Sequence, residues 1–212
     1  MFERYRIGNA QIIGRKKVQS NYFSTKYNKS GDLLAVLADG TIDHPNGRKA
    51  AMLAVEYYID ALSQNLYSGH LNLFALDTAI RANRHIQSLI YIGRIPRLSL
   101  SVVLFSKGEI GYFNVGANEI FLYDGDNERI VSDDTRNPNI SYSSGRLKVR
   151  SKSVIGIMSA GIYAFTHPME RLRIIESKIN TFEKAQAMVE VVNNKKLNNQ
   201  LNATTLLVEV LR

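Results

Sequence analysis

The chain has 212 residues, of which 45% are hydrophobic and 22% charged, and these are ordinary values for a folded globular protein. It contains no cysteine, which excludes disulfides, zinc–thiolate sites and a thiol nucleophile. The formal net charge of +8 favours acidic partners, such as nucleic acid, anionic lipid or phosphoprotein, without choosing among them.

The first residues and the apolar stretches of the chain indicate where in the cell the protein is expected. The first residues, MFERYRIGNA, are charged and lack the apolar core of a signal peptide. Apolar stretches such as residues 98–106 are far shorter than the roughly 20 residues that a membrane span needs. We therefore expect a cytoplasmic protein with no membrane insertion, forming a single domain over residues 1–212.

The first half of the chain predicts two strands followed by two helices. Residues 18–25 and 32–38 read as strands joined by the turn-rich residues 28–31. Apolar residues then recur at helical spacing from Gly47 to about Leu66, and again over residues 71–91.

The second half is mostly strand. Residues 99–133 alternate in polarity and carry closely spaced turns, which predicts an antiparallel meander. LKVRS (147–151) and the apolar run 153–161 predict two more strands, the second of them central. Helices are expected over 168–176 and 181–192, and a last strand over 203–211. This order of elements predicts an α+β layered domain.

A carboxylate at the end of a buried strand marks the first motif. In VLADGTIDHPNGRKAA, residues 36–51, an apolar run stops at Asp39-Gly40, a polar turn carries His44, and a helix begins near Gly47. Such a place suits a metal ion or a phosphate group.

These residues, together with Ala50-Ala51, resemble the Asp-Gly…His-x-x-Gly…Ala-Ser signature of the bacterial metal-dependent Ser/Thr protein phosphatases, the phosphatase 2C type. Four other segments resemble further motifs of that family in the family's order. They are GRKKVQSN (14–21) for Gly-x-Arg-x-x-Asn-Gln-Asp, residues 113–134 for the Gly-Asp-Ser-Arg meander, IGIMSAGIY (155–163) for the Ser-Asp-Gly strand, and residues 201–211 for the closing Asp-Asn-x-Thr strand. The resemblance implies a four-layer α-β-β-α sandwich of two antiparallel sheets with a metal cleft at one end.

The resemblance also implies two Mg²⁺ or Mn²⁺ ions held by carboxylates from four places, of which this sequence keeps one. Asp39 remains, with the backbone carbonyl of Gly40 as a second oxygen ligand, whereas Asn21, Ala160 and Asn202 stand at the other positions. Two divalent ions about 4 Å apart repel by roughly 15 to 20 kcal/mol at an effective dielectric near 20. A single carboxylate cannot offset that repulsion, so we expect a pseudophosphatase with no cofactor and a vestigial metal site that is weak at most.

Each remaining site residue has two interpretations. Asp39 is either a turn carboxylate or a weak ligand for one metal. His44 aligns with a histidine that the family is thought to use as a general acid, or it is a solvated loop histidine. Lys16, with Arg15 adjacent, most nearly matches the family's phosphate-binding arginine, or it is an exposed strand residue.

The loop that carries a flap over the active site in the family is expected to be shortened here. Only about 40 residues separate Gly116 from Ser159, so the flap is expected to be reduced to the loop 134–146.

We therefore expect a non-catalytic module that binds a protein partner, such as a kinase, a phosphoprotein or part of a larger assembly. The alternative is an active phosphatase that uses Mg²⁺ or Mn²⁺ in a remodelled site. Nucleic-acid binding driven by the positive charge is a third hypothesis, but no recognised motif supports it.

Overall fold

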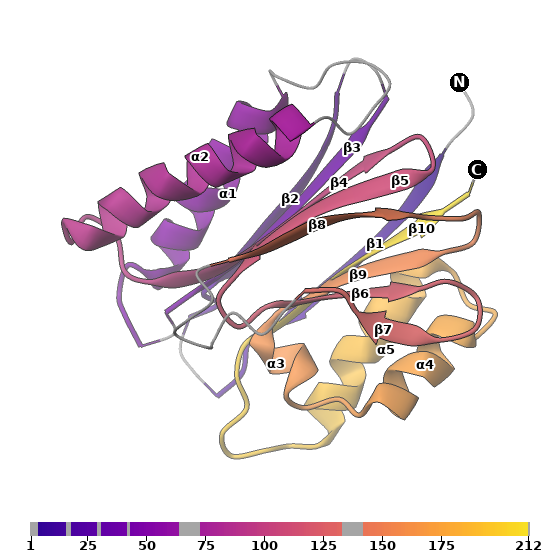
Figure 1. Ribbon diagram of the computed structural model, residues 1–212. Helices are drawn as coiled ribbons and strands as arrows, with labels where there is room; N and C mark the ends of the chain where they lie inside the picture. Colours follow the sequence, from indigo (N-terminus) through magenta and orange to yellow (C-terminus); the bar gives the residue numbers. More distant parts are fainter. Residues whose placement is uncertain are drawn as a thin grey trace.

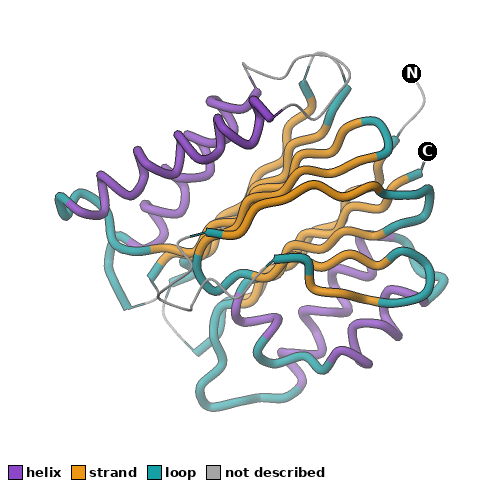
Figure 2. The backbone as a smooth tube through the Cα atoms, in the orientation of Figure 1, coloured by secondary structure: helices purple, strands orange, loops and turns teal. Residues whose placement is uncertain are grey.

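The computed structural model describes residues 4–15, 18–28, 31–41, 43–63, 73–132 and 142–211. Within them, two five-stranded antiparallel sheets lie face to face, and helices cover the outer face of each sheet (Figure 1, Figure 2). The predicted α-β-β-α sandwich is confirmed.

The elements divide between the two halves of the sandwich. The first sheet has the order β2 (Asn21–Tyr27), β3 (Leu33–Gly40), β4 (Leu98–Ser106), β5 (Glu109–Val115) and β8 (Ser143–Lys148). The second has the order β1 (Tyr5–Ile12), β10 (Ala203–Val210), β9 (Val154–Met158), β6 (Glu119–Tyr123) and β7 (Glu128–Ile130). Helices α1 (Gly47–Ser63) and α2 (Leu73–Tyr91) cover the first sheet, and α3 (Ala160–Tyr163), α4 (Pro168–Glu176) and α5 (Thr181–Asn194) cover the second.

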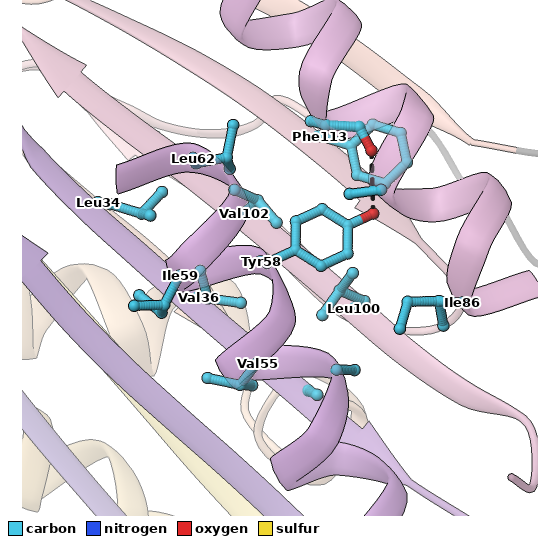
Figure 3. Packing of buried hydrophobic residues seen from close by; sticks show 14 of the residues in the cluster. Leu34, Val36, Val55, Tyr58, Ile59, Leu62, Ile86, Leu100, Val102 and Phe113 are labelled. Carbon is cyan, nitrogen blue, oxygen red and sulfur yellow. Dashed lines mark hydrogen bonds between the residues drawn. The ribbon is translucent and has the colours of Figure 1, made fainter. Parts of the chain in front are cut away.

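Three apolar layers hold the sandwich together, one between the sheets and one under each helical layer. Tyr58 lies at the centre of the layer under α1 and is fully buried (Figure 3). Its hydroxyl donates a hydrogen bond of 3.1 Å to the carbonyl oxygen of Ala79 on α2. Because a buried hydroxyl without a partner is costly, this bond also fixes α2 against α1.

The sequence analysis assigned no element before residue 18, and this was wrong. Residues 5–12 form β1, which pairs along its whole length with β10. Tyr5 and Ile7 have the alternation of a strand, but Gly8 and Asn9 interrupt the apolar pattern. A Cβ at Gly8 would lie 2.0 Å from the carbonyl oxygen of Thr181, so the glycine lets the start of α5 approach the strand.

The predicted meander over residues 99–133 was also wrong in one respect. β4 and β5 belong to the first sheet, whereas β6 and β7 belong to the second, so the chain crosses between the sheets at residues 116–118. Gly116 adopts a left-handed conformation there (φ +86°), and the backbone N–H of Ala117 donates to the hydroxyl of Ser99 at 2.9 Å. The strand expected at 147–151 lies earlier, at 143–148, because a serine- and glycine-containing stretch supplies its first half.

The remaining predicted elements have the expected type. The helix expected to end near Leu66 is described to Ser63, and the turn between the first two predicted strands is described except at residues 29–30. Most of the loop expected to hold a shortened flap, residues 133–141, lies outside the described residues, as do Lys16 and His70. Among the described helices, none is long and apolar enough to cross a membrane.

Candidate functional site

The site predicted from the sequence lies at one end of the sandwich, where β2 and β3 end. Asn21 and Asp39 are directly opposite each other in the antiparallel register, so their side chains share one face of the sheet. That face is the one between the sheets, because Leu37, two residues before Asp39, belongs to the inter-sheet core. Asn21 is fully buried, and its amide nitrogen donates to the hydroxyl of Thr204 on β10 at 3.0 Å.

Asn202, just before β10, has its side-chain amide fully committed to hydrogen bonds. Its Oδ1 accepts from the backbone N–H of Gly14 at 2.9 Å. Its Nδ2 donates to the carbonyl oxygen of Val18 at 2.8 Å and to the hydroxyl of Ser20 at 3.0 Å. Asn202 is buried, so these bonds fasten the segment between β1 and β2 to the start of β10.

Ser159 and Ala160 join the same cluster from the end of β9. The hydroxyl of Ser159 accepts from the backbone N–H of Thr204 at 2.9 Å and lies 3.5 Å from the carbonyl oxygen of Asn202. The amide nitrogen of Asn21 also lies 3.5 Å from that carbonyl oxygen. Ala160 starts α3 and offers only a methyl group. Asn21, Asp39, Ala160 and Asn202, the positions at which the sequence resemblance implied metal-binding carboxylates, therefore lie at one end of the sheets.

Asp39 lines a pocket of about 290 Å³ at this end. The other lining residues are Gly40, Thr41, Arg97, Leu98, Ser99 and Leu201. Burial raises the pKa of Asp39 to about 7, because the ionised carboxylate loses most of its contact with water. Among the described residues no hydrogen bond or ion pair offsets that loss, so the carboxyl group is close to half protonated at neutral pH.

Gly40 and Gly47 let the end of β3 touch the start of α1. A Cβ at Gly40 would lie 2.1 Å from the carbonyl oxygen of Gly47. The adjacent residue Arg48 donates from its guanidinium to the backbone carbonyl of Asn21, and that guanidinium lies over the ring of Tyr22, 4.9 Å from its centre. The start of α1 is therefore held against β2 beside the pocket.

His44 lies in the turn before α1 and is exposed. Its Nδ1 accepts a hydrogen bond of 3.1 Å from the backbone N–H of Asn46. His44 is not among the described residues that line the Asp39 pocket. Here it stabilises the turn that leads into the helix.

Of the two basic residues predicted to contact phosphate, Arg15 is described and does not line the pocket. The Arg15 side chain donates from Nε to the carbonyl oxygen of Leu197 at 3.3 Å, next to the backbone bond between Arg15 N–H and the carbonyl of Gln200. Lys16 lies outside the described residues. The arginine that does line the pocket is Arg97.

Sequence reasoning missed Thr41, Arg97 and Ser99. They reach the pocket because β3 pairs with β4 in a register that places Gly40 opposite Leu98. The hydroxyl of Thr41 donates to the carbonyl oxygen of Arg97 at 2.5 Å and closes this wall. Only the correct strand pairing could have found these residues, since they carry no motif of their own. The described residues contain no group of three or more His, Cys, Asp or Glu side chains placed to hold a metal.

No protein-family model matches this sequence, and no curated protein matches it either. Solved structures do match over almost the whole chain. The Ser/Thr phosphatase PstP/Ppp of Mycobacterium tuberculosis has 16% identity and a TM-score of 0.80, with 99% of this chain and 100% of that chain covered.

Two further structures match with similar coverage. The catalytic domain of PstP in complex with two manganese ions has 16% identity and a TM-score of 0.80, with 99% of both chains covered. PppA, described as a key regulatory component of the T6SS in Pseudomonas aeruginosa, has 16% identity and a TM-score of 0.75, with 98% of both chains covered. Structure and sequence motifs therefore agree that this chain has the fold of the phosphatase 2C-type Ser/Thr phosphatases.

Proposed function

We propose that this chain is a catalytically inactive phosphatase-fold module that acts by binding a protein partner. The partner class is a kinase, a phosphoprotein or a component of a larger assembly, and residues 1–212 form one cytoplasmic domain. The observation that carries the proposal is the state of Asn202, whose amide is saturated by Gly14, Val18 and Ser20 at a position where the family has a carboxylate ligand.

The donor set does not fit a pair of divalent ions. Mg²⁺ and Mn²⁺ prefer anionic oxygen ligands, and Asp39 is the one carboxylate among the four aligned positions. Asn202 could coordinate only by breaking hydrogen bonds, and Ala160 has no donor. The Oδ1 of Asn21 is buried without a partner among the described residues, but an amide oxygen brings no charge. We therefore expect no Mg²⁺ or Mn²⁺ cofactor.

The fold neighbours support a role in regulation by protein contacts. One of them, PppA, is described as a regulatory component of a larger system, and the positive charge of this chain suits an acidic protein surface. These points support a binding role without identifying the partner.

One observation favours the alternative, an active metal-dependent Ser/Thr phosphatase with a remodelled site. At the wall of a pocket, Asp39 keeps a carboxyl group that is costly to ionise and has no partner among the described residues. If that alternative holds, Asp39 and the carbonyl of Gly40 would hold a single Mg²⁺ or Mn²⁺, which would supply Lewis-acid activation of water. Arg15, Lys16 and His44 would then be the residues to examine for phosphate contact and proton transfer.

Metal titration and turnover distinguish the two functions. We expect calorimetry with Mn²⁺ to show no pair of micromolar sites, and hydrolysis of p-nitrophenyl phosphate or phosphopeptides to be negligible with Mg²⁺ or Mn²⁺. Turnover on the order of 1 s⁻¹ or faster that Asp39→Ala abolishes would overturn the proposal.

A triple reversion tests whether the aligned positions form one metal cleft. Asn21→Asp, Ala160→Asp and Asn202→Asp together should lower the melting temperature in EDTA, through carboxylate repulsion and the loss of the Asn202 donor bonds. Excess Mn²⁺ should restore about 2.7 kcal/mol when free metal is a hundredfold above its dissociation constant. Failure of both shifts would show that the alignment with the phosphatases is wrong at these positions.

A further inference from the structure

The strand β8 has a free backbone edge. It lies at the end of the strand order of the first sheet, beside β5 only, and the described residues place no strand on its outer side (Figure 1). The backbone N–H of Val149 donates to the carbonyl of Gly108 at 2.9 Å, in the register that pairs Lys148 with Glu109. Because bonded and non-bonded pairs alternate in an antiparallel ladder, the N–H and C=O groups of Ser144, Arg146 and Lys148 point away from the sheet.

The same edge carries a row of positive charge. Arg146, Lys148 and Arg150 are exposed, whereas Leu147 and Val149 between them pack against the inter-sheet core. We name these three cations the basic edge. In the described part of the chain they form no ion pair. Arg146 and Lys148 follow one another at roughly 6.6 to 6.8 Å, the repeat of alternate residues along a strand, and Arg150 lies two residues beyond the end of β8.

Neighbouring residues leave the basic edge accessible and electropositive. The residue opposite Arg146 on β5 is Gly111, which has no side chain to cover the guanidinium. Opposite Lys148 is Glu109, the acidic residue of this register, and Lys107 is exposed in the next turn. The local balance therefore stays positive.

We propose that the basic edge binds an acidic, extended segment of a partner protein, which adds to β8 as a further strand of the first sheet. An extended peptide offers donors and acceptors that alternate like those of the free edge, and acidic side chains at every second residue would face Arg146, Lys148 and Arg150. Main-chain bonds supply affinity in this mode, and the alternating charges select the partner.

The same features disfavour the other occupants. The phosphate groups of a nucleic acid only accept hydrogen bonds, and its backbone has no row of N–H donors at the strand repeat to match the outward carbonyl groups of β8. A second copy of this chain would bring the same cations against each other, which is how natural edge strands avoid pairing with themselves. The inference goes beyond the proposed function, because it specifies the chemistry of the partner and a surface three strands away from β3 and the Asp39 pocket.

The test is fluorescence anisotropy with a labelled synthetic peptide in which glutamate alternates with valine. The wild-type chain should bind it, and should not bind a peptide with lysine in place of glutamate. Arg146→Glu with Lys148→Glu should weaken binding by about tenfold or more. The matched control, Arg173→Glu with Lys178→Glu on and after α4, changes the net charge equally at other exposed residues and should leave the affinity within about twofold.

A proline variant separates strand addition from charge attraction alone. Ser144→Pro keeps every charge but removes one outward N–H, at an edge where proline is tolerated. It should weaken binding of the peptide while the melting temperature stays close to that of the parent. A peptide with proline in place of each valine should also fail to bind the wild-type chain.

Three results would overturn the proposal: no binding of the alternating acidic peptide, equal loss in the matched control, or equally strong displacement by single-stranded RNA. Asp39→Ala should leave peptide binding unchanged, and catalysis is not measured here. The result of the peptide-binding test is therefore independent of whether the Asp39 pocket is catalytically active.

Discussion

Two polar groups at the same end of the sandwich are in opposite physical states. The amide of Asn202 is buried and uses both of its ends in hydrogen bonds, so it contributes to the stability of the fold. The carboxyl group of Asp39 is largely removed from water and has no partner among the described residues, so it lowers stability whenever it is ionised. The Asn202 side chain therefore has a structural role. The Asp39 carboxyl group has no structural role that the described contacts explain. A half-buried carboxyl group at a pocket, with no partner among the described residues, is more plausible as a binding residue than as a structural one.

The largest effect should come from removing the structural amide. Asn202→Ala deletes three hydrogen bonds, one buried and two part-buried, and leaves the N–H of Gly14 and the carbonyl of Val18 without their partner. We expect a loss of about 3 kcal/mol in the free energy of unfolding, measured by urea denaturation. Asn193→Ala, at an exposed position of α5, is the control and should change stability by less than about 0.5 kcal/mol. If Asn202→Ala and Asn193→Ala changed stability equally, the Asn202 amide would not be a stabilising group, and its contrast with the Asp39 carboxyl would be lost.

Replacing Asp39 should raise the free energy of unfolding, whereas replacing Asn202 should lower it. Its pKa lies at about 7 in the folded chain against 3.8 normally, so between these values the folded state binds more protons than the unfolded state. Stability therefore falls as the pH rises from about 4 to about 7 and changes little beyond, by linkage. Asp39→Asn removes this loss and should be more stable than the parent by about 2 kcal/mol at pH 8, with little difference at pH 4.

Urea denaturation at pH 4, 6 and 8 measures this dependence. The control Asp124→Asn, at an exposed residue beyond β6, keeps Asp39 and should therefore follow the pH dependence of the parent at all three pH values. A parent whose stability is constant over this range would mean that Asp39 finds a partner in solution, and the comparison with Asn202 would no longer hold.

The smallest effect concerns the contact that holds α1 beside the pocket. Arg48→Met removes the bond to the carbonyl of Asn21 and the stacking on Tyr22, for an expected loss of about 1 kcal/mol. Lys49→Met, exposed on the same helical turn, should be nearly neutral. If both variants behave alike, the guanidinium does not help to position this end of the site.

The sequence predicted the layers of the fold better than the path of the chain within them. Ordered motifs were enough to bring Asn21, Asp39, Ala160 and Asn202 to one end of the sheets, because each stands at the end of an apolar strand. The hydrogen bonds of Asn202 could not be predicted, because their partners lie far away in the sequence. Those partners are in an irregular segment between β1 and β2, which no periodic pattern predicts.

The two errors in the fold also have physical causes. β1 was missed because its apolar alternation stops at Gly8, where contact with the start of α5 requires a glycine. The crossing at residues 116–118 was missed because a turn between two strands looks the same whether the strands pair or enter different sheets. Arg97 reached the candidate pocket through strand pairing alone, which no local pattern records.

The position of β10 has a consequence for how the protein is made. This strand lies between β1 and β9 and pairs with both, so within the described residues β1 has no neighbour in its sheet until residues 203–210 have been made. During synthesis the first helical layer and β2 to β5 can assemble early, because their pairings are mostly sequential. β6, β7 and β9 can pair with one another before then, but β1 cannot join the second sheet until residues 203–210 have left the ribosome. A nascent chain that stalls earlier would leave part of the inter-sheet core exposed.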